Sequence, residues 1–149
     1  QIEQKRPKDQ TIIFAATRHH VEFLYEVTRA AGCRVTYIYG AMDQSTREDR
    51  LMKFRTKKFN FLIVTDLAAR GIDIPLLENV IHYDFPTSLK LFIHRSGRTA
   101  RPGQKGTAYC LVTGEEIAYM HDLSVYVGRK YADCPEFLER FKKEMSVEE

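Results

Sequence analysis

Residues 60–75 read NFLIVTDLAARGIDIP, and this stretch decides the fold class. Its first part, Phe61–Thr65, is an apolar run of strand length. Its second part, from Asp66 to Pro75, places polar side chains around a turn of small residues. In α/β proteins, ligands bind at the carboxyl ends of parallel strands, where such turns occur. The stretch therefore predicts a buried strand of an α/β sheet with a ligand site directly behind it.

A second informative stretch, residues 94–101, reads HRSGRTAR and carries three arginines at spacings of three. Guanidinium groups bind phosphate oxygens through paired hydrogen bonds and stay charged at physiological pH. The cluster therefore predicts a polyphosphate ligand or neighbouring carboxylates. Because a proline and a glycine follow, Arg98 is expected near a helix C-terminus and Arg101 in the turn beyond it. A solvated basic helix end that complements the helix dipole is the alternative.

Together the two stretches resemble motifs V and VI of the C-terminal RecA-like domain of the DEAD-box RNA helicases. Two weaker similarities lie in the same order. The run TIIFAATR at residues 11–18 is similar to motif IV, and Gly40, Gln44 and Arg47 are similar to the HGxxxQxxR element. The resemblance extends from about residue 10 to about residue 130. His94 favours the DEAD-box branch, since the related DEAH-type helicases usually carry glutamine there.

The chain also departs from the family pattern. Tyr39 stands where the family commonly has histidine, and Ala100 where it usually has glycine. More important, the chain contains neither a GxxxxGK[ST] loop nor a DEAD tetrapeptide. A nucleotidase needs a phosphate cradle and an acidic group for Mg²⁺. We therefore expect one half of a two-domain enzyme, with ATP and Mg²⁺ held mainly by an N-terminal RecA-like domain.

The composition is that of an ordinary globular protein, with 149 residues, 44% hydrophobic and 29% charged. It predicts a single domain over residues 1–149, with flexible ends at 1–9 and 146–149. The net charge is +3 but uneven, because residues 47–101 carry eleven Lys and Arg against six Asp and Glu. This basic excess suits contacts to a nucleic-acid backbone, and solvated surface is the alternative.

Several classes of protein are disfavoured. The three cysteines lack CxxC spacing, which argues against a disulfide framework or a zinc site. No apolar run approaches membrane-spanning length, and no signal peptide is visible. We therefore expect an intracellular protein with no membrane partner and no metal site of its own.

The hydrophobic pattern alternates between strands and helices. Strands are expected at Thr11–Ala16, Arg34–Tyr39, Phe61–Thr65, Asn79–Tyr83 and Thr107–Val112. Helices are expected at Arg18–Ala31, from an N-cap at Asp43 to Thr56, and at Ser88–Arg98, Glu115–Val127 and Pro135–Met145. The order predicts a doubly wound α/β fold, a mostly parallel sheet flanked by helices in a three-layer α/β/α sandwich. The resemblance implies the same RecA-like architecture.

Three of these helices have apolar residues along one face, and in the helix from Pro135 they are Phe137, Leu138, Phe141 and Met145. In the first helix the face comprises Phe23, Leu24, Val27, Ala30 and Ala31. In the helix from Glu115 the residues expected to point inward are Ile117, Met120, Leu123 and Val127.

The resemblance implies roles for four residues of the arginine-rich stretch. Arg98 and Arg101 resemble arginine fingers, which stabilise the charge on the departing γ-phosphate when two domains dock. His94 and Arg95 resemble coupling residues that sense the partner domain's acidic motif and the attacking water.

Motif V supplies further nucleotide-site candidates by the same resemblance. Asp73 resembles the carboxylate that binds the ribose of ATP, and Gly71 lies beside it in the same motif. Arg70 is expected in the interdomain network. An exposed turn aspartate and a salt-bridged surface arginine are the respective alternatives for Asp73 and Arg70.

The candidates for RNA contact lie at strand ends or a helix start, where hydroxyl, N–H and guanidinium groups bind backbone oxygens without reading sequence. They are Thr17, Arg18, Gly40, Gln44, Arg47, Thr65 and Asp66. A solvated helix face is the alternative for Gln44 and Arg47, and strand-end capping for Thr17 and Thr65.

The sequence thus predicts the second RecA-like domain of an ATP-dependent RNA helicase, a monomer that is inactive alone. Residues 72–86, IDIPLLENVIHYDFP, are similar to a nucleolar, ribosome-assembly branch, so the nucleus or nucleolus is the expected location and the cytoplasm the alternative. One alternative function is a non-catalytic RecA-like module that docks RNA or protein, for which intact fingers would have no use. Another is a DNA-directed helicase, which His94 disfavours.

Overall fold

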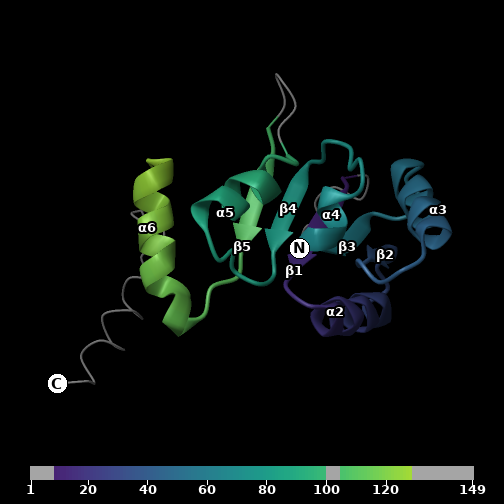
Figure 1. The fold of residues 1–149 in the computed structure, drawn as a ribbon, viewed down its shortest axis with the longest axis horizontal. Helices are drawn as coiled ribbons and strands as arrows, with labels where there is room; N and C mark the ends of the chain where they lie inside the picture. Colours follow the sequence, from purple (N-terminus) through teal and green to yellow (C-terminus); the bar gives the residue numbers. More distant parts are fainter. Residues whose placement is uncertain (1–8, 100–104, 129–149) are drawn as a thin grey trace. The chain divides into compact units, whose positions relative to one another are not determined.

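The computed structural model describes residues 9–99 and 105–128, and within them helices flank a five-stranded sheet (Figure 1). The strands are β1 (Thr11–Ala15), β2 (Val35–Ile38), β3 (Phe61–Thr65), β4 (Asn79–His82) and β5 (Thr107–Cys110). Their spatial order is β2-β3-β1-β4-β5, and every pairing is parallel. The expected fold class is confirmed, and the sheet expected to be mostly parallel is wholly parallel in this part of the chain.

The helices that follow the first four strands are α2 (Arg18–Ala30), α3 (Gln44–Arg55), α4 (Asp66–Arg70) and α5 (Leu89–Ser96). In each case the side chain of the preceding residue accepts a hydrogen bond from a backbone N–H of the first turn. These N-caps are Thr17, Asp43, Thr65 and Ser88. The cap expected at Asp43 is confirmed, whereas α4 is a short helix where the sequence predicted only a turn. Helix α5 ends two residues earlier than predicted, with Gly97 as its C-cap, so Arg98 lies outside it.

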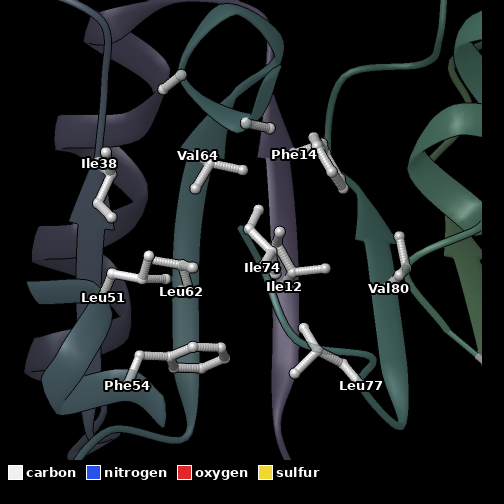
Figure 2. Close-up of a cluster of buried hydrophobic side chains, with 12 residues drawn as sticks. Ile12, Phe14, Ile38, Leu51, Phe54, Leu62, Val64, Ile74, Leu77 and Val80 are labelled. Carbon is white, nitrogen blue, oxygen red and sulfur yellow. The ribbon is translucent and has the colours of Figure 1, made fainter. Parts of the chain in front are cut away.

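Alternate residues of the central strands enter two separate hydrophobic clusters. In β1, Ile12 and Phe14 join one cluster, and Ile13 and Ala15 join the other. Figure 2 shows the first cluster, in which side chains of β1, β3 and β4 pack with Leu51 of α3. The second cluster packs against α2. The sheet is therefore covered on both faces, as wholly parallel sheets require, and the three-layer arrangement follows.

The apolar face predicted for α2 is wrong in part. Leu24 is buried, but Phe23 and Val27 are about half exposed. Val21 and Leu24 make the buried face, and Tyr25 packs partly against the same cluster. Helix α2 carries more apolar residues than its contact with the sheet buries. The apolar pattern of the sequence therefore predicted a wider buried face than the structure has.

Backbone contacts divide the chain into two compact units, residues 1–111 and 112–149. In the described part of the second unit, η1 (Gly114–Glu116) precedes α6 (Ile117–Val127), which ends at Gly128 in the left-handed conformation. Leu123 is buried but Val127 is exposed, so the face predicted to point inward is only partly correct. The single-domain interpretation stays a prediction, and the helix expected at Pro135–Met145 lies outside the described residues. Among the helices of residues 9–99 and 105–128, none is long and apolar enough to cross a membrane.

Candidate functional site

The strand-end candidates gather at the carboxyl edge of the sheet. Thr17 follows β1, Gly40 follows β2, and Thr65 ends β3. The register pairs Ala15 with Thr65, so the ends of β1 and β3 lie at the same level. A Cβ atom at Gly40 would lie 3.2 Å from Leu67 Cδ2, which places Gly40 against the start of α4. This edge is where ligands bind in open parallel sheets.

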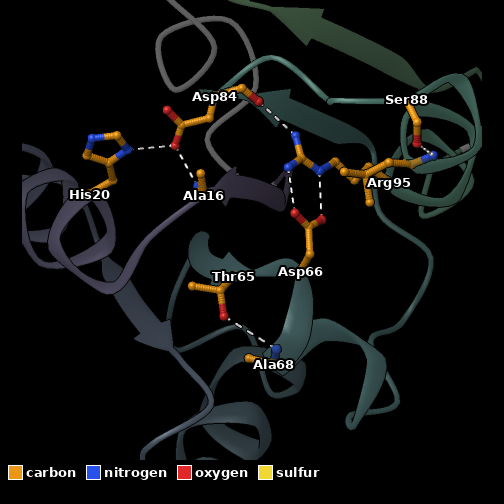
Figure 3. Close-up of polar contacts among 9 residues, drawn as sticks. Ala16, His20, Thr65, Asp66, Ala68, Asp84, Ser88 and Arg95 are labelled. Carbon is orange, nitrogen blue, oxygen red and sulfur yellow. Dashed lines mark hydrogen bonds and ion pairs between the residues drawn. The ribbon is translucent and has the colours of Figure 1, made fainter.

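Arg95 of α5 reaches this edge with a side chain that is only 2% exposed. Its Nε and Nη2 donate to Asp66 Oδ1 and Oδ2 at 2.7 and 2.6 Å, and its Nη1 donates to the Asp84 carbonyl at 2.8 Å (Figure 3). Its guanidinium also lies 5.3 Å from the centre of the Phe14 ring. Asp66, a candidate for RNA contact, therefore has both carboxylate oxygens bound to Arg95. The protein itself supplies the carboxylate that this member of the arginine cluster needs.

His82 of β4 is fully buried and lies near enough to Arg95 for that charge to affect its ionisation. Its ring stacks with Phe14 at 6.3 Å and with Phe92 at 5.1 Å, and its Nε2 lies 3.1 Å from Ser96 Oγ. Among the described residues its Nδ1 has no hydrogen-bond partner. Burial, with a smaller contribution from the positive charge of Arg95, lowers the pKa of His82 to about 4. The ring is therefore neutral at physiological pH, as its position beside a buried cation requires.

Asp84, two residues beyond β4, accepts hydrogen bonds through both its backbone carbonyl and its carboxylate. Its carbonyl accepts the hydrogen bond from Arg95, while its Oδ2 lies 2.5 Å from Ala16 N and 2.8 Å from His20 Nδ1 (Figure 3). Sequence reasoning missed both Asp84 and His20. The available signal was a polar residue just behind a parallel strand, the same signal that marked Asp66 behind β3.

Arg98 lies just beyond the C-terminal end of α5 and differs from Arg95. Its backbone is anchored, because Leu77 N donates to the Arg98 carbonyl at 2.8 Å. Arg98 is half-buried, and its side chain contacts His94, with Arg98 Nη2 3.2 Å from His94 Nε2. Among residues 9–99 and 105–128, no carboxylate forms an ion pair with Arg98. Arg101, the other finger candidate, lies outside the described residues.

Asp73, the ribose candidate, has a side chain that is 94% exposed. Its Oδ2 lies 2.9 Å from Arg55 Nη2, which also donates to the Asp73 carbonyl. Gly71 caps the end of α4, and a Cβ there would lie 3.0 Å from Arg47 Nη2, so a larger residue would displace that side chain. Arg70 is exposed at the last position of α4.

Two of the RNA candidates are exposed side chains, each paired with a carboxylate one helical turn away. Arg18 Nε donates to Glu22 at 2.8 Å, and Gln44 Nε2 donates to Glu48 at 2.7 Å. The Arg18 guanidinium also lies 4.9 Å from the centre of the Tyr39 ring. Exposed pairs of this kind contribute little to stability, so both side chains can exchange these partners for a ligand.

The other RNA candidates are more firmly placed. Arg47 is half-buried, with Nη2 3.4 Å from the Ala68 carbonyl and a buried Nε that has no partner among the described residues. Thr17 Oγ1 accepts from His20 N at 3.1 Å, and Thr65 Oγ1 accepts from Ala68 N at 3.4 Å. The capping alternative for the two threonines is therefore realised. Capping leaves a hydroxyl proton that can still be donated to a phosphate oxygen.

A metal site does not form in the described part of the chain, where no three His, Cys, Asp or Glu side chains gather as ligands. Burial raises the pKa of the Cys110 thiol to about 11, so this cysteine is protonated at neutral pH. The site is thus a set of cations, hydroxyls and one exposed carboxylate, which suits a nucleotide or nucleic-acid backbone.

Comparison with known proteins agrees with this chemistry. Residues 1–103 match the family described as the helicase conserved C-terminal domain. The ATP-dependent RNA helicase dbp10 of Emericella nidulans is 52% identical over 129 residues, which cover 87% of this chain and 14% of that protein. The chain therefore spans about one seventh of the length of this relative.

Solved structures give the same result. The E. coli DEAD-box protein SrmB, in a complex with the regulator of ribonuclease activity A, matches with a TM-score of 0.78 and 35% identity over 84% of this chain and 74% of that chain. DEAD-box helicase domain 2 of Mss116p, bound to an RNA duplex, matches with a TM-score of 0.72 and 28% identity over 83% of this chain and 49% of that chain. This chain therefore belongs to the helicase conserved C-terminal domain family, in its DEAD-box branch.

Proposed function

We propose that this chain is the second RecA-like domain of an ATP-dependent RNA helicase and that it supplies Arg98 and Arg101 as arginine fingers. One observation carries the proposal. Arg95 is buried and neutralised by Asp66, whereas Arg98 forms no ion pair with a carboxylate of the described residues. A guanidinium anchored through its backbone and not paired with an acid is available to a γ-phosphate.

The remaining nucleotide-site residues take complementary parts in this proposal. His94 contacts Arg98 and couples this domain to the attacking water and the partner's acidic motif, and Arg95, held by Asp66, acts by keeping the helix that carries His94 in place. The exposed carboxylate of Asp73 accepts a hydrogen bond from a ribose hydroxyl, which requires it to exchange the Arg55 pair. Gly71 keeps the turn before Asp73 free of a side chain.

Several members of the assembly lie outside this chain. Mg²⁺ and most contacts to ATP belong to an N-terminal RecA-like domain, which Arg70, exposed at the end of α4, helps to bind. The two-domain protein acts as a monomer in this proposal. A nucleolar role in ribosome assembly rests on the resemblance of residues 72–86 alone.

RNA binds in this proposal along the carboxyl edge of the sheet, through backbone oxygens and without regard to base. The candidates are Thr17, Arg18, Gly40, Gln44, Arg47, Thr65 and Asp66, of which Asp66 acts by holding Arg95 in place. Two facts support this path. Arg47 Nη2 makes a long hydrogen bond, 3.4 Å to the Ala68 carbonyl, that a phosphate oxygen can replace, and the similar Mss116p domain was solved with an RNA duplex.

The test separates an enzyme domain from a docking module. The chain alone should give no RNA-stimulated ATP hydrolysis, and the two-domain protein that contains it should hydrolyse ATP when RNA is added. Arg98→Ala should abolish that hydrolysis while leaving RNA affinity without nucleotide within about twofold. Equal losses of turnover and RNA affinity would instead identify a non-catalytic RNA-docking surface.

A further inference from the structure

We propose that Asp84 is a positioning residue, which holds the candidate RNA-contacting segment behind β1 in place relative to the helix that precedes Arg98. Asp84 belongs to neither motif V nor motif VI. The inference rests on the proposed function, because it assumes that Thr17 and Arg18 contact RNA and that Arg98 contacts ATP. It adds a residue that touches neither ligand and joins the two places where they bind.

The carboxylate of Asp84 fixes the segment that leads into α2. One oxygen, Oδ2, accepts from Ala16 N at 2.5 Å and from His20 Nδ1 at 2.8 Å (Figure 3). These donors lie on either side of the two RNA candidates, Thr17 and Arg18. Thr17 also accepts a hydrogen bond from His20 N as the N-cap of α2. Three hydrogen bonds therefore hold residues 16–20 in place. Loss of the carboxylate would free the backbone at Ala16 and the ring of His20 together.

The carbonyl of the same residue fixes the finger helix. Arg95 Nη1 donates to it at 2.8 Å, while the rest of the guanidinium binds Asp66. Arg95 directly follows His94 and lies three residues before Arg98. The side chain of Asp84 is 23% exposed, so its hydrogen bonds are partly shielded from water. Asp84 therefore binds the segment behind β1 through its carboxylate and the helix before Arg98 through its carbonyl.

This division makes the proposal testable by side-chain substitution. Any residue at position 84 keeps the carbonyl, so the contact with Arg95 persists. Asp84→Ala removes only the acceptor for Ala16 and His20. Asp84→Asn keeps one oxygen that can accept from both donors, since His20 Nδ1 can carry a proton in the neutral ring. A positioning role therefore predicts loss in the alanine variant and rescue in the asparagine variant.

The experiment measures RNA-stimulated ATP hydrolysis by the two-domain protein as a function of RNA concentration. For Asp84→Ala we expect the RNA concentration at half-maximal rate to rise about five- to tenfold, the size expected from losing two hydrogen bonds. Turnover at saturating RNA should fall by less than about twofold, because the contacts of Arg95 persist. Asp84→Asn should lie within about twofold of the unsubstituted protein. The thermal unfolding midpoint of each variant is recorded beside the kinetics.

The outcomes separate the inference from the function on which it rests. A fall in turnover with an unchanged half-saturating RNA concentration would show a merely structural residue and overturn the inference. Arg18→Ala serves as the control for the RNA path. If it raises the half-saturating concentration and Asp84→Ala does not, the inference alone fails. If Arg18→Ala has no effect, the RNA path is wrong and the inference falls with it.

A second variant covers the case in which Asp84→Ala does not fold. His20→Ala removes one of the two hydrogen bonds from a side chain that is 46% exposed, so folding should tolerate it. The expected rise in half-saturating RNA concentration is about threefold. No rise in this variant would overturn the inference.

Discussion

The surroundings of Arg95 and Arg98, three residues apart in one motif, differ in almost every physical respect. Arg95 is 2% exposed, forms a bidentate ion pair with Asp66 and donates its remaining hydrogen bond to a backbone carbonyl. Arg98 is half-buried, and in the described residues its guanidinium is hydrogen-bonded to the ring of His94 and forms no ion pair with a carboxylate. Removing one partner of a buried pair leaves an uncompensated charge, whereas removing an arginine with no paired acid does not.

The difference shows that two arginines of one motif can have different roles. Arg95 is paired with an acid of the protein, so we expect its replacement to lower the free energy of unfolding. Arg98 is not paired with an acid of the described residues, so we expect its replacement to lower ATP turnover. Substitutions at the two positions should therefore change different measured properties.

The largest effect is expected at Arg98. In the two-domain protein, Arg98→Ala should lower ATP turnover by on the order of 10³ to 10⁵, the contribution of an arginine finger. The free energy of unfolding of the chain should change by less than about 0.5 kcal/mol, because the guanidinium forms no ion pair with a carboxylate of the described residues. Turnover at saturating ATP and RNA checks the first statement and urea denaturation the second. Arg29→Ala, which removes an exposed arginine on α2, is the matched control.

Arg95 should show the reverse pattern. Arg95→Met should lower the free energy of unfolding by about 3 to 4 kcal/mol, because it leaves the Asp66 carboxylate without its partner. Adding Asp66→Leu should recover part of this loss, since the pair would then be replaced by apolar groups. Urea denaturation of the two single variants and the double variant measures the coupling. Additive losses would contradict the structural role of the pair.

The buried His82 should make the free energy of unfolding depend on pH. The unfolded chain takes up a proton as the pH falls below about 6.5, whereas the folded chain does so only near the lowered pKa of about 4. Unfolding is therefore favoured as the pH falls through this window, by up to about 1.4 kcal/mol per pH unit, and the contribution is absent above it. His82→Gln should flatten the dependence relative to the exposed control His19→Gln. If the free energy of unfolding depends on pH equally in the two variants, a group other than His82 causes the dependence.

The smallest effect concerns RNA at Arg47. Arg47→Ala should lower the slope of log K against log salt for single-stranded RNA by about 0.7, the value of one phosphate contact. The half-buried guanidinium makes a long hydrogen bond, from Nη2 to the Ala68 carbonyl at 3.4 Å, which it can exchange for a phosphate oxygen. Lys53→Ala, on the same helix but paired with Asp49, is the control and should leave the slope unchanged. An unchanged slope in Arg47→Ala would place Arg47 outside the RNA path.

Much of this architecture could be predicted from local patterns. The apolar runs that became β1 and β3 are bounded by polar residues, and the capping preference of Asp43 fixes the start of α3. Pairings over long sequence distances could not be predicted. Asp66 and Asp84 bind Arg95 across 29 and 11 residues, and only the folded sheet brings them together. For this reason the sequence assigned Asp66 to RNA, although both of its oxygens are occupied within the protein.

The measurement that tests the division most directly is the turnover of Arg98→Lys in the two-domain protein at saturating ATP and RNA. Lysine keeps the positive charge but lacks the planar set of N–H donors that binds a phosphate through paired hydrogen bonds. If Arg98 is a finger, turnover should fall by at least about a hundredfold with an unchanged unfolding midpoint. Turnover within about threefold of the unsubstituted protein would contradict the division between Arg95 and Arg98.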